Sequence, residues 1–144
     1  MCDIRLAIAT TTTVENVEAL INHTLGSGAL SWFDVIGAGD VVPNKKPAPD
    51  IYVYVMEQLD LSADQCLAFE DSENGIQATR GSKLTTVITI NDYTRDHNFD
   101  GAALVLDQLG EPGAPFQVLQ GDAGDHSYFN VELAKIIHRH YQRT

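Results

Sequence analysis

The feature that most constrains the fold of this chain is the regular alternation of short apolar runs with amphipathic stretches. The run Leu6–Ala9 precedes a stretch from Val14 to Leu25 in which hydrophobic residues recur at helical spacing. Further apolar runs lie at 32–36, 66–69 and 84–90, with helical patterns at 51–59 and 73–80 between them. This alternation is typical of parallel strands joined by helices. The sequence therefore predicts an α/β protein in which helices cross over a parallel sheet.

The length of the chain, 144 residues, fits one folded domain. We expect a single core domain over residues 1–144. Within it, 110–127 should be an irregular loop because glycine, proline and acidic residues are dense there, and 128–142 should form a C-terminal helix.

The charge balance argues against several kinds of partner. Nine Lys and Arg against 20 Asp and Glu give a formal net charge of −11, which repels nucleic acid and anionic membranes. No apolar run approaches the roughly 20 residues that a membrane helix needs. The only two cysteines, Cys2 and Cys66, lack the close spacing of metal or redox pairs, so we expect a reducing, cytoplasmic location.

Three polar sets follow apolar runs or precede helices, where ligands bind in parallel sheets. The hydroxyl and N–H groups of Thr10 and Thr11 could hold a phosphate at a helix start. Lys46, in a proline-rich loop, could neutralise that phosphate, and Glu70 and Asp71 could bind magnesium. Each set also has a simpler explanation: helix capping from Thr12 to Glu15, a solvated lysine, and acidic residues at a helix start.

The order of the three sets makes three independent simple explanations improbable. Together they resemble motifs of the haloacid dehalogenase superfamily, in its β-phosphoglucomutase-like and phosphoglycolate-phosphatase-like branch. The resemblance covers Leu6 to about Leu109, and its most specific parts are Lys46-Pro47-Ala48-Pro49-Asp50-Ile51-Tyr52 and Phe69-Glu70-Asp71-Ser72-Glu73-Asn74-Gly75-Ile76.

The resemblance implies a role for each matching position. Thr10 would hydrogen-bond the transferring phosphoryl group, and Lys46 would neutralise its charge and orient the nucleophile. Glu70 and Asp71 would bind or position Mg²⁺. Asn74 would lie next to these ligands without binding the ion directly. The implied activity is that of a magnesium-dependent phosphatase or phosphomutase acting on a phosphorylated small molecule, with inorganic phosphate as a second ligand.

One motif of the family is absent from these 144 residues. Family members attack phosphorus with the first aspartate of an Asp-x-Asp motif, and no such tripeptide occurs in the sequence. The resemblance implies an α/β fold with a three-layer, Rossmann-like parallel sheet, and we expect here a partial core of it, without the first strand or the cap domain, that is inactive on its own. Two alternatives stay open: a non-catalytic binding or oligomerisation module, and a split enzyme completed by another chain.

The same comparison predicts a structural consequence. In the family, the strand that bears Asp-x-Asp lies centrally, between the strand ending at Thr10 and the strand ending at Phe69. Without it those two strands either pair directly or leave a place for another segment or a second copy of the chain. A homodimer or domain swap is therefore expected.

Overall fold

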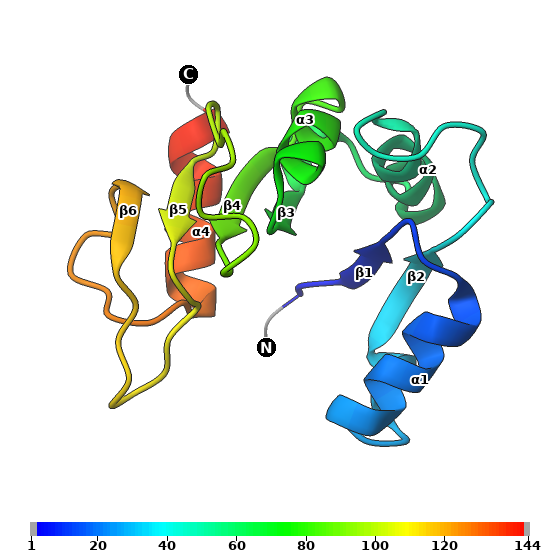
Figure 1. The fold of residues 1–144 in the computed structure, drawn as a ribbon, viewed down its shortest axis with the longest axis horizontal. Coiled ribbons are helices and arrows are strands. Elements are labelled where there is room, and N and C mark those ends of the chain that lie inside the picture. The colour runs from blue at the N-terminus through cyan, green and yellow to red at the C-terminus, as the bar shows by residue number, and fades with distance from the viewer. Residues whose placement is uncertain (1–2, 143–144) are drawn as a thin grey trace.

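Two separate sheets form the framework of the protein, described over residues 3–142 in a computed structural model (Figure 1). The first contains β1 (Leu6–Ala9) and β2 (Phe33–Gly37), which pair in parallel. The second has the order β3-β4-β5-β6, with bounds Leu67–Glu70, Thr85–Thr89, Leu104–Leu106 and Val118–Gly121. All neighbours in it are parallel except β5 and β6. The expected α/β class is confirmed.

Helices cover both faces of the first sheet. Helix α1 (Val14–Thr24) buries Val17 and Ile21 in a cluster that includes Ile8 and Ile36 of the strands. Helix α2 (Asp50–Leu59) lies so close to β2 that a Cβ at Gly37 would meet Val55 Cγ2 at 2.6 Å. A side chain at position 37 would push this helix off the sheet.

The second sheet lies between two further helices, α3 (Glu73–Gly81) and α4 (Val131–Gln142). Adjacent residues of β4 point to opposite faces, so Val87 packs in the cluster that contains Leu133 of α4. Ile88 packs in the one that contains Ile76 of α3. Two short 3₁₀ helices, Ala29–Trp32 and Ala63–Gln65, precede β2 and β3. This gives the three-layer arrangement predicted from the sequence.

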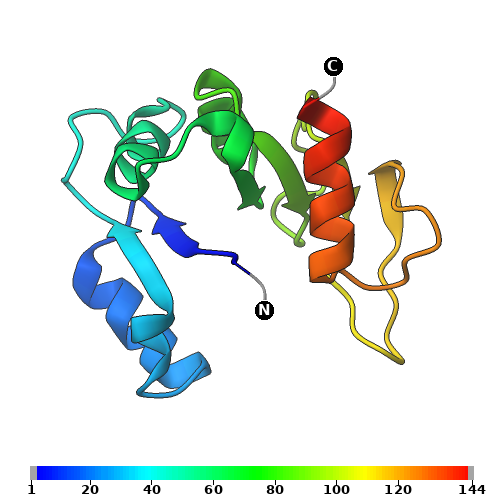
Figure 2. The ribbon, with the colours of Figure 1, turned by 180° about the vertical axis from the view of Figure 1, so that it is seen from behind.

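Helix α2 joins the two sheets. Its Ile51 and Tyr52 share a buried cluster with Ala68 of β3 and Ala78 of α3. In Figures 1 and 2 the sheets stand on either side of the α2 and α3 region, with β1 and β3 as their inner strands. Within residues 3–142, β1 pairs only with β2 and β3 only with β4. The two inner strands therefore do not pair directly with each other.

Two local features differ from the sequence-based expectations. The N-cap of α1 is Thr13, whose side chain accepts a hydrogen bond from the Asn16 N–H, whereas the pattern at Thr12 to Glu15 placed the cap one residue earlier. The segment 110–127 includes strand β6, which pairs with β5. In the described part of the chain, no helix is long and apolar enough to cross a membrane.

Candidate phosphate and metal site

Lys46 connects the carboxyl ends of the two inner strands. Its Nζ donates to the carbonyl oxygen of Ala9, the last residue of β1, at 3.0 Å, and forms an ion pair with Glu70, the last residue of β3. The side chains of Lys46 and Glu70 are only 14% and 7% exposed. At such burial an unpaired charge would be costly, so each charge stabilises the other in place.

The loop before α2 brings Lys46 to this position. Asn44 Nδ2 donates to Asp50 Oδ2 at 3.0 Å, and Ala48 N donates to the Lys45 carbonyl at 3.0 Å. Both contacts span Lys46 and close the loop around it. The proline-rich segment therefore holds the lysine in a fixed geometry.

Thr10 lies immediately after β1, beside the Ala9 carbonyl that accepts from Lys46. Its N–H donates to Gly37 O at 2.9 Å, which continues the parallel pairing with β2 by one residue. Its hydroxyl accepts from Thr12 N at 3.2 Å and can still donate its own hydrogen to an anion. Thr11 is exposed. The threonine segment and Lys46 therefore lie together at the carboxyl end of β1.

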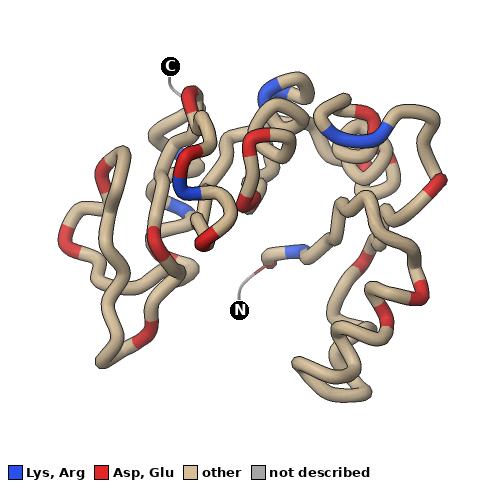
Figure 3. Tube along the Cα trace, in the orientation of Figure 1, with Lys and Arg blue, Asp and Glu red and all other residues tan. Residues whose placement is uncertain are grey.

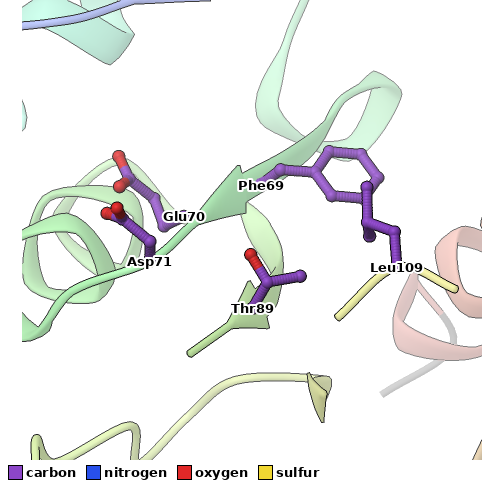
Figure 4. A pocket seen from close by; sticks show the side chains of 5 residues that line it. All are labelled: Phe69, Glu70, Asp71, Thr89 and Leu109. Atoms are coloured by element: carbon purple, nitrogen blue, oxygen red, sulfur yellow. The ribbon is translucent and has the colours of Figure 1, made fainter. Parts of the chain in front are cut away.

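Glu70 and Asp71 occupy different environments although they are adjacent. The Glu70 carboxylate is buried, and its Oε1 accepts from both Lys46 and the Tyr52 hydroxyl. Asp71 is exposed and lines a pocket of about 250 Å³ together with Phe69, Glu70, Thr89 and Leu109. Figure 4 shows the two carboxylates at one end of this pocket and the apolar Phe69 and Leu109 at the other. Of the two carboxylates, Asp71 is the one open to a ligand.

The start of α3 lies next to the acidic pair. Ser72 caps the helix by accepting from Gly75 N at 3.1 Å, and Glu73 N donates to His97 Nδ1 at 3.1 Å. Asn74 is exposed in this first turn, three residues beyond Asp71. The N–H groups of Glu73 and Gly75 in this first turn are thus already in use.

The oxygen donors at the end of β3 suit a hard cation. Mg²⁺ is usually held by one or two carboxylates, with water and phosphate oxygens completing its shell. Asp71 provides one open carboxylate, with the paired Glu70 next to it, although within the described residues no three His, Cys, Asp or Glu side chains gather as a metal cluster. The residues therefore fit a magnesium ion that also takes ligands from a phosphate.

The surrounding field makes Lys46 important for any anion. Figure 3 shows acidic residues distributed along the whole chain and few basic ones, in keeping with the net charge of −11. A phosphate at this edge needs local positive charge to offset that field. Lys46 is the cation that the fold places there.

Tyr52 is the contact of this site that the sequence did not reveal. As an aromatic residue on the inner face of α2, Tyr52 is only 8% exposed. Its hydroxyl, however, reaches Glu70. A signal was available, because a tyrosine on the buried face of a helix needs a polar partner for its hydroxyl.

Comparison with known proteins identifies the class of this chain. Residues 1–82 match the family model described as haloacid dehalogenase-like hydrolase, and the chain belongs to that family. The structure is a partial core of this fold.

Among individual proteins the chain is similar to CbbY. It is 46% identical to Protein CbbY of Cereibacter sphaeroides over 110 residues, which cover 76% of this chain and 48% of that protein. It is 34% identical over 82 residues to the fructose-1-phosphate phosphatase YqaB of Escherichia coli, covering 57% and 42% of the two chains. The chain thus spans about half the length of the curated relatives that it matches.

Solved structures agree with this comparison. CbbY from Rhodobacter sphaeroides in complex with phosphate has a TM-score of 0.71 and 47% identity, covering 73% of this chain and 47% of that one. A mutant of the same protein in complex with xylulose-(1,5)bisphosphate gives the same values. The β-phosphoglucomutase of Clostridium difficile, 20% identical, covers 99% of this chain with a TM-score of 0.70 and supports the fold alone.

Proposed function

We propose that this chain provides the phosphate-binding and magnesium-binding half of a haloacid dehalogenase-type phosphatase or phosphomutase. The observation that carries the proposal is the position of Lys46 Nζ, which contacts Ala9 at the end of β1 and Glu70 at the end of β3. This contact brings three sequence-distant polar sets to one edge of the fold. The substrate class would be a phosphorylated sugar, since related proteins bind phosphate and xylulose bisphosphate.

Each residue would act through its own chemistry. The Thr10 hydroxyl would donate to a phosphate oxygen, and Lys46 would offset the phosphate charge. Asp71 would hold Mg²⁺, with Glu70 next to it and Asn74 nearby. Thr11 would lie beside the phosphate. When bound, magnesium would neutralise charge on the phosphate oxygens.

Turnover requires a nucleophile that these 144 residues do not contain as an Asp-x-Asp motif. The residues present can bind and polarise a phosphate ester, but they cannot form a phosphoaspartate at the family's position. We therefore propose that the chain alone is inactive and that an aspartate from further sequence or another polypeptide completes it. We place this function in the cytoplasm.

Binding and turnover can be tested separately. Calorimetric titration with inorganic phosphate in the presence of Mg²⁺ should show binding at millimolar concentrations, and Asp71→Ala should abolish the magnesium dependence. The same protein should not hydrolyse a generic aryl phosphate. Aryl-phosphate hydrolysis that Asp71→Ala removes would contradict the inactive state, whereas absence of phosphate and magnesium binding would favour a non-catalytic interaction module.

We further propose that an additional strand lies between β1 and β3, and that in the isolated chain a second copy supplies it. Each inner strand has one unpaired edge in the described residues, and Leu6 and Phe69 on them are 44% and 48% exposed. Unpaired strand edges with exposed apolar side chains favour pairing with another chain. The product would be a homodimer or domain swap.

Sedimentation analysis tests this assembly. The wild-type chain should sediment as a dimer, and Phe69→Lys should dissociate it because a charge on the inner strand disfavours pairing. Leu119→Lys, at the opposite edge of the second sheet on β6, is the control and should leave the dimer intact. A wild-type monomer, or dissociation only by Leu119→Lys, would contradict the proposal.

A further inference from the structure

Tyr52 has a buried hydroxyl to which the proposed function gives no role. It lies on α2, and its side chain is enclosed between the two sheets. The hydroxyl donates to Glu70 Oε1 and lies 3.5 Å from Lys46 Nζ. The Lys46 ammonium group is also 4.9 Å from the centre of the Tyr52 ring. Tyr52 therefore contacts both charges of the buried pair.

The hydrogen bonds around the pair show what this hydroxyl supplies. The Lys46 ammonium group has three donors and uses them toward Ala9 and Glu70, with Tyr52 at longer range. Glu70 Oε1 accepts from Lys46 and Tyr52, while Oε2 faces the backbone of Gly75. Without the Tyr52 hydroxyl, Lys46 alone would hold Oε1. A buried carboxylate with fewer donors turns toward other donors or water.

The hydroxyl keeps its hydrogen for this contact. Burial, and then the negative charge of Glu70 and the hydrogen bond to it, raise the pKa of Tyr52 well above its ordinary value. A tyrosine hydroxyl has a hydrogen to donate at neutral pH, and a carboxylate can only accept.

We propose that Tyr52 is a positioning residue of the phosphate site. Its hydroxyl fixes the direction of Glu70 Oε1, and Glu70 in turn keeps the Lys46 ammonium group between the ends of β1 and β3. The inference rests on the proposed function, in which Lys46 binds phosphate. Tyr52 would not touch the ligand and would act through Glu70 alone.

Substituting Tyr52 by phenylalanine isolates the hydroxyl, because the ring and its packing remain. Phosphate affinity in the presence of Mg²⁺ should fall about five- to tenfold in Tyr52→Phe, the scale of one typical net hydrogen bond, because Tyr52 acts on the ligand only through Glu70. Tyr54→Phe removes a hydroxyl from the same helix away from Glu70 and should leave affinity unchanged. Equal losses in the two variants would overturn the proposal.

A double substitution tests whether Tyr52 acts through Glu70. The variant Glu70→Gln removes the charged acceptor, so adding Tyr52→Phe to it should change phosphate affinity less than twofold. If Tyr52 only supported the packing of α2, its effect would be the same with and without Glu70→Gln. Additive losses would therefore overturn the proposal.

A spectroscopic measurement keeps the inference separate from the proposed function. The ¹⁵Nζ resonance of Lys46, assigned by its loss in Lys46→Arg, should shift and exchange faster with solvent in Tyr52→Phe but not in Tyr54→Phe. An unchanged Lys46 signal would refute the role of Tyr52. If the wild-type chain binds no phosphate, the proposed function fails, and this resonance still decides whether Tyr52 positions Lys46.

Discussion

The Glu70 carboxylate lies directly against the backbone of Gly75. A Cβ at position 75 would come 2.1 Å from Glu70 Oε2 and 2.4 Å from the carboxyl carbon. Helix α3 can begin this close to the end of β3 only because residue 75 has no side chain. The glycine therefore makes room for the carboxylate that pairs with Lys46.

Gly75→Ala should displace Glu70 and separate it from Lys46. Breaking a buried pair costs about 3 kcal/mol, which exceeds the gain of about 1 kcal/mol from alanine in a helix, so the free energy of unfolding should fall by roughly 2 kcal/mol. Urea unfolding measures this change. Gly28→Ala, where a Cβ meets nothing within 4 Å, is the control and should be nearly neutral.

Removing the charge of Lys46 should leave Glu70 buried without its partner. Lys46→Met should lower the free energy of unfolding by about 3 kcal/mol. Adding Glu70→Gln should restore part of this loss, because the remaining buried group is then neutral. The double-mutant cycle measures the coupling by chemical denaturation. Simple additivity of the two changes would show that the pair is not coupled.

Asp71→Asn should affect magnesium far more than folding. Asp71 is exposed, so the substitution should change the free energy of unfolding by less than about 0.5 kcal/mol. Calorimetry should show the loss of magnesium-dependent phosphate binding. Glu18→Gln, which removes an exposed acid from α1, controls for the change in net charge. If both variants weakened phosphate binding equally, the cause would be the net charge of the protein and not a magnesium site at Asp71.

The thiol of Cys66 should make the protein less stable at alkaline pH. Burial and then the charge of Asp64 raise the pKa of Cys66 in the folded state, so folding favours the protonated thiol. Its contribution is complete below the pKa of the unfolded chain and is lost as the pH rises through the folded-state pKa. In a Cys2→Ser background, urea unfolding from pH 8 to 10.5 should show a decline that Cys66→Ala reduces. An identical pH dependence of the two proteins would contradict this expectation.

Much of the architecture could be predicted because hydrophobic periodicity indicates where strands and helices form. Apolar runs and helical spacing located β1 to β4 and the helices, and the motifs located Thr10, Glu70 and Asp71 after strands and Lys46 in the loop before α2. The cap of α1 was displaced by one residue because Thr12 and Thr13 can both cap a helix. Here Thr12 Oγ1 accepts from the Asn16 side chain instead. Local sequence does not decide between two equivalent hydroxyls.

Features that depend on distant contacts were beyond sequence patterns. Strand β6 is short, all four of its residues are exposed, and it exists through its pairing with β5. Adjacent acids could not be told apart in sequence, yet Glu70 is enclosed by Lys46 and Tyr52 while Asp71 faces the pocket. Burial of one carboxylate and exposure of the other are tertiary properties.

The double contact of Lys46 also bears on folding dynamics. Its partners Ala9 and Glu70 are 37 and 24 residues away along the chain, so one ammonium group closes two long loops at once. Transient opening of either sheet breaks the link to the other. Amide hydrogens at the ends of β1 and β3 should therefore exchange through a common cooperative opening, and ligand capture by Lys46 would slow exchange in both.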